Sequence, residues 1–150
     1  MDLIIRRARL TDIDAILEVE KRCFGEDRFS KQQLTYLATK SKGIFYLCKY
    51  QGEVVAYISL LSHKNRNNLR IYSIAVSPEV QGKGIGKMLF EKAVQYAVKK
   101  RLWMINIEVR TNNEATIGFC LKNGFKNAGL KKEYYSDGAD AYMMHFYPLL

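Results

Sequence analysis

Residues 70–109 carry a strand–turn–helix–strand pattern that limits the possible folds more than any other part of the chain. The segment LRIYSIAV has the β-branched and aromatic residues of a strand, and Pro78 ends it. After the glycine-rich stretch VQGKGIGK, apolar residues recur at helical spacing through about Lys100, and the apolar segment LWMINIEV follows. This order predicts a parallel pair of strands joined by a right-handed helical crossover.

The residues before this unit predict antiparallel strands and two helices. The segment DLIIRRA, at residues 2–8, reads as a first strand, and Thr11 opens a helix. Ser30 and Gln33 have the spacing of a capping box for a second helix, with the loop FGEDRF between the two helices. The runs GIFYLCKY and VVAYISLL, joined by QGE, predict a hairpin.

The residues after the unit predict one more helix and a second hairpin. Asn113 begins a short helix that ends at Asn123–Gly124, a left-handed C-cap. FKNAGLKKEYY and ADAYMMHFY predict two strands around the hairpin dipeptide Asp137–Gly138. We therefore expect a single domain over residues 1–150 of the mixed α/β class, with about seven strands.

Composition narrows the environment and the partners of the chain. Its longest apolar runs are far shorter than the ~20 residues of a membrane span, and MDLIIRRARLTD does not resemble a signal peptide, so we expect a cytoplasmic protein. Cys23, Cys48 and Cys120 lack metal-type spacing and are expected to be free thiols. The net charge of +9 suits a nucleic acid, a ribosome or a polyanionic cofactor, and it also suits solubility alone.

The stretch VQGKGIGK places three glycines and two lysines directly before a helix. Backbone N–H groups at a helix start attract anions, and glycines let a phosphate approach them closely, although a tight turn without a ligand would also use glycines. A P-loop does not fit, because Gln81 stands at its first glycine position and Met88 at its Ser/Thr position. A dinucleotide loop fits poorly, because Lys87 replaces its third glycine.

A third interpretation rests on a family resemblance. Gln81–Gly86 resemble the Q/R-x-x-G-x-G/A signature of the GNAT acetyltransferases. Four segments in order, IYSIAVSPEVQGKGIG, IEVRTNNEAT, LKNGF and YYSDGADAYMM, resemble the RimI-type ribosomal-protein alanine N-acetyltransferases and their archaeal relatives over about residues 70–147. The resemblance implies the GNAT fold, a twisted mixed sheet with helices on both faces and a cofactor cleft between strands 4 and 5.

The resemblance also implies acetyl-coenzyme A as the cofactor, with its pyrophosphate on the amides at the start of the helix. Backbone N–H groups near Ala75 or Val76 would donate to the thioester oxygen. Asn113 would bond the pantetheine arm, and it can also be a simple helix cap. The implied cofactor-binding residues are Ile74, Ala75, Val76, Gln81, Gly82, Lys83, Gly84, Ile85, Gly86, Lys87 and Asn113.

Glu108 is the candidate general base. Alternation in the strand places Glu108 on the face opposite Ile107, where a carboxylate is expected only at an opening between the covering helices. From the residues alone, Glu108 can also be a rim carboxylate paired with a lysine or with Arg110. The resemblance implies that Glu108 deprotonates the substrate amine.

Cys120 departs from the family pattern, because it stands where the RimI-type proteins have a tyrosine as general acid. A thiol can protonate a leaving thiolate, but a buried core cysteine is an equally good interpretation. Tyr72, Tyr142 or a water molecule could supply the proton instead. Slow product release could also remove the need for an acid.

The resemblance places the acceptor between the loop after the first helix and the last hairpin. This nominates Phe24, Glu26, Phe29, Tyr134 and Tyr135 as substrate-binding residues, with ordinary strand packing as the alternative for the two tyrosines. His63 and His145 are expected to be structural or solvated, and no metal site is expected.

The expected function is transfer of acetyl from acetyl-coenzyme A to the N-terminal α-amine of a ribosomal protein or nascent chain, by direct attack in a ternary complex. The expected partner is thus a protein or peptide N-terminus, and the substrate protein could be bound to the ribosome. We expect neither membrane binding nor direct readout of a nucleic acid. One alternative is an acetyltransferase for small-molecule amines on the same fold. Another is a catalytically weak coenzyme A-binding subunit.

Overall fold

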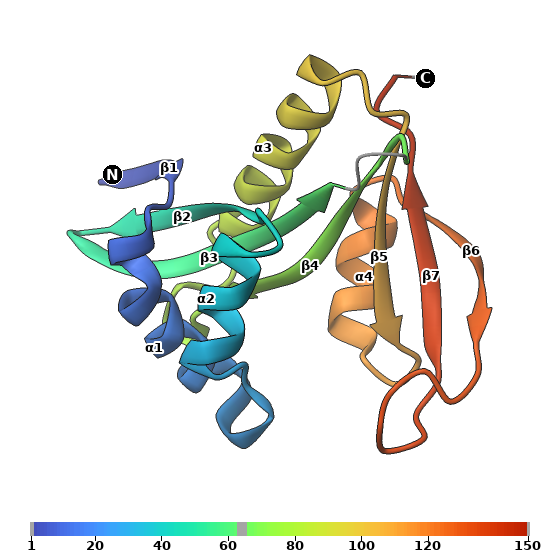
Figure 1. Cartoon of the computed structure of the whole chain (residues 1–150), viewed down its shortest axis with the longest axis horizontal. Coiled ribbons are helices and arrows are strands. Elements are labelled where there is room, and N and C mark those ends of the chain that lie inside the picture. The colour runs from blue at the N-terminus through green and yellow to red at the C-terminus, as the bar shows by residue number, and fades with distance from the viewer. Residues whose placement is uncertain (1, 63–65, 150) are drawn as a thin grey trace.

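The computed structural model describes residues 2–62 and 66–149, which form one seven-stranded sheet in the order β1-β2-β3-β4-β5-β7-β6 (Figure 1). The strands are β1 (Leu3–Arg7), β2 (Ile44–Tyr50), β3 (Glu53–Ser62), β4 (Asn68–Val76), β5 (Met104–Arg110), β6 (Lys126–Lys131) and β7 (Ala141–Phe146). The helices are α1 (Ile13–Phe24), α2 (Lys31–Thr39), α3 (Ile85–Lys99) and α4 (Glu114–Lys122).

The parallel pair predicted around the glycine-rich stretch is confirmed. β4 and β5 pair in parallel across the α3 crossover, and the other paired strands are antiparallel. The first hairpin turns at Gln51 and Gly52, which both have positive φ, and this conformation matches the right-handed twist of the two strands. The mixed α/β class is therefore confirmed.

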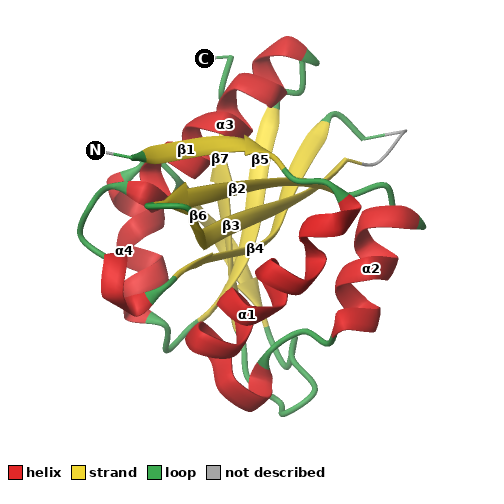
Figure 2. Cartoon of the chain, turned by 90° about the vertical axis from the view of Figure 1, so that its left-hand side faces the viewer, coloured by secondary structure: helices red, strands yellow, loops and turns green. Residues whose placement is uncertain are grey.

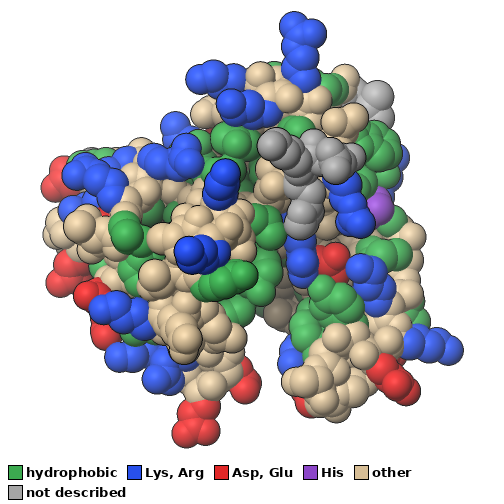
Figure 3. All heavy atoms as spheres, viewed as in Figure 1, with side chains coloured by type: hydrophobic (Ala, Val, Ile, Leu, Met, Phe, Trp, Pro, Cys, Tyr) green, Lys and Arg blue, Asp and Glu red, His purple; other side chains and the backbone are tan. Residues whose placement is uncertain are grey.

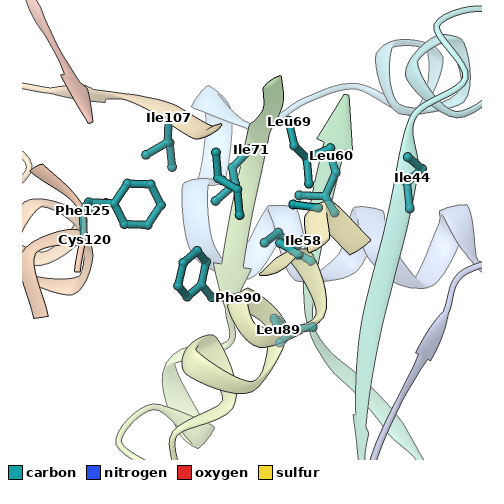
Figure 4. Packing of buried hydrophobic residues seen from close by; sticks show 14 of the residues in the cluster. Ile44, Ile58, Leu60, Leu69, Ile71, Leu89, Phe90, Ile107, Cys120 and Phe125 are labelled. Atoms are coloured by element: carbon teal, nitrogen blue, oxygen red, sulfur yellow. The ribbon is translucent and has the colours of Figure 1, made fainter. Parts of the chain in front are cut away.

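Helices cover both faces of the sheet, as expected (Figure 2). α1 and α2 bury their apolar residues on one face, against side chains such as Phe45, Leu47 and Tyr57. α3 and α4 pack on the other face in a larger core, which includes Ile58, Leu89 and residues of β5 (Figure 4). The two cores fix the sheet between two helical layers.

Local hydrogen bonds explain where the first two helices begin. Leu10–Asp12 form a 3-10 turn, so α1 begins at Ile13 instead of Thr11. The Asp12 carboxylate accepts the Arg9 N–H at 2.7 Å, and its two hydrogen bonds with the Arg6 guanidinium lower the pKa of Asp12 to about 2. Ser30 and Gln33 form the predicted capping box of α2.

The predicted strand that includes Tyr134 and Tyr135 is wrong. β6 ends at Lys131, and residues 132–140 form a loop that returns to β7. Glu133 has φ of 50°, which a continuous strand does not allow, and the Gly138 N–H donates to the Tyr135 carbonyl at 2.9 Å to close a turn. The Asp137–Gly138 dipeptide thus makes a turn, but inside a longer loop.

The remaining structural expectations concern cysteines and histidines. Cys23, Cys48 and Cys120 are free thiols, as predicted. His145 lies beside Tyr147, and burial lowers the pKa of its imidazole, whereas His63 lies outside the described residues. Within residues 2–62 and 66–149, no helix could cross a membrane and no cluster of His, Cys, Asp and Glu could hold a metal ion.

Candidate active site

β4 and β5 pair only where residues 68–70 meet residues 104–106, and beyond that point the two strands separate (Figure 1). A cleft of about 1200 Å³ lies between β4, α3 and α4. Ten of the eleven predicted cofactor-binding residues line it: Ile74, Ala75, Val76, Gln81, Gly82, Gly84, Ile85, Gly86, Lys87 and Asn113. Residues from three separate chain segments therefore meet at one opening in the sheet.

The start of α3 has the backbone geometry of an anion site. Gly84 is the N-cap of α3, and its backbone is in the left-handed region, with φ of 77°. The Met88 N–H donates to the Gly84 carbonyl at 3.1 Å, which is the first hydrogen bond of the helix. The N–H groups of residues 85–87 therefore have no carbonyl of the helix to bond. A Cβ on Gly82 or Gly84 would meet no atom within 4 Å, so the space beside the loop is open and fits a pyrophosphate.

Lys83 is the exception among the predicted cofactor-binding residues. Its ammonium lies 5.4 Å from the centre of the Tyr50 ring, and Lys83 is absent from the cleft lining. The alternation of glycine and lysine in the loop turns Lys83 toward β2, whereas Lys87 lies on the cleft side. A role of Lys83 in cofactor binding therefore stays a prediction.

The backbone of β4 offers a donor at the cleft. The Ser77 N–H donates to the Val55 carbonyl on β3 at 2.8 Å, so alternation points the Ala75 N–H to β3 and the Val76 N–H away from it. The Val76 carbonyl also faces away from β3, because it accepts hydrogen bonds from the Cys23 thiol and the Gln81 side-chain amide. Of the two predicted donors, Val76 has its N–H on the open side.

A β-bulge interrupts β4 at Tyr72. Ser73 is opposite Ser59, and Ile71 is opposite Leu60, so Tyr72 has no opposite residue on β3. The bulge places Tyr72 and Ser73 on the same face, because the Tyr72 ring lies 5.4 Å from the Phe29 ring while the Ser73 hydroxyl bonds Tyr57 on the α1 side. The bulge thus brings an extra aromatic ring to the predicted acceptor side.

Glu108 lies on the sheet face that α1 and α2 share, while Ile105, Ile107 and Val109 enter the opposite core. Its side chain is 11% exposed and forms ion pairs with Arg70 on β4, at 3.1 Å, and with Lys131 on β6, at 3.5 Å. Of the two partners considered for Glu108 as a rim carboxylate, a lysine is present, as Lys131, whereas Arg110 binds Asp137 at 2.9 Å. Figure 3 shows that this face is hollowed between the two halves of the molecule and that basic side chains gather there.

The two loop tyrosines lie beside these ion pairs. Arg70 donates to the Tyr134 hydroxyl at 2.8 Å, and the Lys131 ammonium lies 5.2 Å from the centre of the Tyr134 ring. Tyr135 packs edge-on against Tyr134, and the Arg110 guanidinium lies 4.1 Å from the centre of its ring. Burial raises the pKa of Tyr135, so its hydroxyl stays protonated at neutral pH.

The other predicted acceptor residues lie on or beside the loop after α1. Phe24 lines the cleft, and Phe29 packs against Tyr72. Glu26 is exposed in the short turn Gly25–Asp27. Asn113 serves as the N-cap of α4, where its side chain accepts the Thr116 N–H at 3.1 Å, and it also lines the cleft.

Cys120 is part of the core and does not reach the cleft. Its side chain is 3% exposed and lies beside Phe125 (Figure 4), whereas Phe119 is the neighbouring residue that lines the cleft. Burial raises the pKa of the Cys120 thiol to about 12. A thiol that holds its proton so strongly is a poor acid for a thiolate of ordinary pKa, about 8.5, so the structure favours the packing interpretation.

Cys120→Ala is accordingly expected to leave kcat and its pH profile unchanged and to lower the free energy of unfolding by about 1–2 kcal/mol, because the change leaves a small cavity. Steady-state kinetics and thermal unfolding of the same preparation test both parts. A large loss of kcat at unchanged stability would restore Cys120 as an acid.

Comparison with known proteins identifies the family. A family model described as the acetyltransferase (GNAT) family matches residues 13–125. The chain belongs to the GNAT family. This GNAT protein is thus an N-acetyltransferase, and acetyltransferases of the family take their acetyl group from acetyl-coenzyme A.

Several relatives of this GNAT chain match it over nearly its whole length. An N-alpha-acetyltransferase of Sulfurisphaera tokodaii is 31% identical over 93% of this chain and 90% of that protein. A Bacillus subtilis protein, named as a candidate ribosomal protein bS18-alanine N-acetyltransferase, is 30% identical over 93% of this chain and 92% of its own length. The crystal structure of the Escherichia coli ribosomal-protein-S18-alanine N-acetyltransferase, 24% identical, superposes with a TM-score of 0.85 over 97% of this chain and 93% of that chain, which shows the same fold.

Proposed function

We propose that this protein transfers the acetyl group of acetyl-coenzyme A to the α-amine of a protein N-terminus, either of a ribosomal protein or of a nascent chain. Two relatives at about 30% identity have names that specify N-terminal acceptors, which supports this substrate class. Such acceptors are made on ribosomes, so the proposal includes a cytoplasmic location and contact with the ribosome. The net charge of +9 would favour that contact.

The observation that carries the proposal is the opening between β4 and β5, which connects the two faces of the sheet. Different residues lie at the opening on each face. The cleft with its amide-rich helix start belongs to the α3 and α4 side. Glu108 and the aromatic loops belong to the α1 and α2 side. An amine and a thioester could therefore meet through the opening from opposite faces, which supports direct attack in a ternary complex.

The residues around Glu108 suit a base for an amine. Arg70 and Lys131 form ion pairs with the Glu108 carboxylate, and their positive charges favour a neutral amine over an ammonium ion beside them. In the proposed reaction, Glu108 takes one proton from the amine, directly or through water, as the nitrogen forms its bond to the acetyl carbon. The Val76 N–H donates to the acetyl oxygen, where negative charge develops.

Acetyl-coenzyme A supplies the acetyl thioester, and the sulfur leaves with the electron pair of the broken carbon–sulfur bond. We assign the proton for this sulfur to water, because Cys120 is buried in the core. The N–H groups of residues 85–87 and the Lys87 side chain would hold the pyrophosphate.

The acceptor side suits a peptide. Phe29, Tyr72 and Tyr134 present aromatic rings beside the ion pairs of Glu108, and these rings could pack on the first side chain of an N-terminus. Phe24 and Glu26, on the loop side, and Tyr135, on the opposite loop, would contact the following residues. Tyrosine hydroxyls can donate to and accept from the peptide backbone.

A panel of peptides with different first residues tests the proposal, with acetyl-coenzyme A as donor and mass spectrometry as readout. We expect acetylation at the α-amine, with at least about a tenfold spread in kcat/KM among first residues, the size of effect that one pocket contact produces. Matched peptides with a blocked α-amine and a free lysine are the control. Acetylation of polyamines alone, or cofactor binding without turnover on any amine, would contradict the proposal.

A further inference from the structure

Glu20, in the middle of α1, is a buried carboxylate that the proposed chemistry does not use. Its side chain is 1% exposed, and among the described residues it is the one charged side chain in the buried class. A carboxylate without partners is costly to bury, so its hydrogen bonds must offset its lost hydration. The positions of these partners indicate what Glu20 holds in place.

Both oxygens of Glu20 have donors from outside α1. The Phe29 N–H donates to Oε2 at 3.1 Å, and the Tyr57 hydroxyl donates to Oε1. The Tyr57 oxygen is also 2.8 Å from the Ser73 hydroxyl, which is 2.7 Å from the Ser59 hydroxyl. Burial raises the pKa of Glu20, and the two donors oppose that rise.

These partners are segments of the proposed acceptor side. Phe29 ends the loop that follows α1, and Ser73 adjoins the bulge residue Tyr72. The Phe29 ring packs against Tyr72, whose ring is 5.2 Å from the Arg70 guanidinium, and Arg70 binds Glu108. One buried carboxylate thus anchors both segments that carry the aromatic contacts beside the proposed base.

We propose that Glu20 is a positioning residue that fixes the loop Gly25–Phe29 against the bulge of β4, in the arrangement that binds the acceptor. The role in acceptor binding rests on the proposed function, whereas the anchoring of the loop does not. The N–H groups predicted to hold the pyrophosphate are at the start of α3, on the other side of the sheet, so cofactor binding should depend far less on Glu20 than acceptor binding does.

Two substitutions separate anchoring from burial. Glu20→Gln can keep every bond, because the amide oxygen accepts from Phe29, the amide nitrogen donates to Tyr57, and Tyr57 then donates to Ser73. Glu20→Met has a similar length but cannot replace these bonds, so the loop loses its anchor. Glu18→Met on the exposed side of α1 is the matched control.

Limited trypsin digestion measures how often the loop Gly25–Phe29 opens, because trypsin cleaves after arginine and the exposed Arg28 precedes Phe29. Cleavage at Arg28–Phe29 is expected to be about 10–100-fold faster in Glu20→Met, the ratio that loss of a hydrogen bond to a charged group produces. Glu20→Gln and Glu18→Met should remain within about threefold of the wild type. Equal acceleration at all tryptic sites, or none at Arg28, would overturn the proposal.

Kinetics test the acceptor role on the same variants. Glu20→Met is expected to raise KM for the acceptor peptide about tenfold or more, and its Kd for coenzyme A by calorimetry should stay within about twofold of the wild type. Equal losses for peptide and cofactor, or an unchanged peptide KM, would overturn the acceptor role. If the wild type acetylates no peptide, the proposed function fails, and the trypsin result still decides whether Glu20 anchors the loop.

Discussion

Glu108→Gln is expected to lower kcat by about 10²–10⁴-fold, because the variant keeps the shape of the side chain and loses the group that takes the proton from the amine. KM for acetyl-coenzyme A should stay within about twofold, since the predicted pyrophosphate site at the start of α3 is on the other side of the sheet. The dependence of kcat/KM on pH that arises from ionisation of the base should disappear. Steady-state kinetics across a pH series measure all three quantities.

The ion pairs of Glu108 require a control for stability. Removing the carboxylate leaves Arg70 and Lys131 close together without their shared partner, so thermal unfolding of the variant must accompany its kinetics. Glu53→Gln, an exposed change at the start of β3, is the matched substitution. A Glu108→Gln variant with wild-type pH dependence would remove Glu108 from the role of base.

Val76→Pro is expected to lower kcat by about 10²–10³-fold, the usual loss when one donor to a developing oxyanion is removed. Proline deletes the N–H that faces the cleft, and because this N–H points away from β3, the change removes no hydrogen bond of the β3–β4 ladder. Coenzyme A titration by calorimetry checks that the cleft still forms.

Val76→Ala separates the backbone from the side chain, because it shortens the side chain and keeps the N–H. We expect this variant to retain kcat within about threefold, which corresponds to less than 1 kcal/mol in the barrier. If Val76→Ala loses as much activity as Val76→Pro, the effect belongs to packing and the assigned donor is wrong.

Local signals in the sequence predicted the elements that depend on neighbouring residues. The capping box of Ser30 and Gln33 and the turn at Gln51–Gly52 each need only a few adjacent side chains, and both are present. The cofactor side was also predictable, because most of its residues belong to one continuous glycine-rich stretch. The loop at 132–140 was missed because its aromatic residues resemble a strand, while the backbone turn at Glu133 has no strong sequence signal.

The acceptor side depends on contacts between distant parts of the chain, which alternation and spacing do not specify. Arg70 and Glu108 are 38 positions apart, and Glu20 and Tyr57 are 37 apart. One signal was available: Glu20 is a charged residue within the otherwise apolar face of α1, and such residues usually have a buried partner. The bulge at Tyr72 left no signal, because it depends on the register between β3 and β4.

The brief pairing of β4 and β5 also bears on how the protein unfolds. Most sheets are most cohesive at their centre, whereas here a seam of three register positions divides the sheet into β1–β4 and β5–β7. The two parts can therefore open as separate cooperative units, with α3 as their main bridge. A ligand in the cleft contacts both parts and adds cohesion at the seam, so it should slow hydrogen exchange at amides that it never touches.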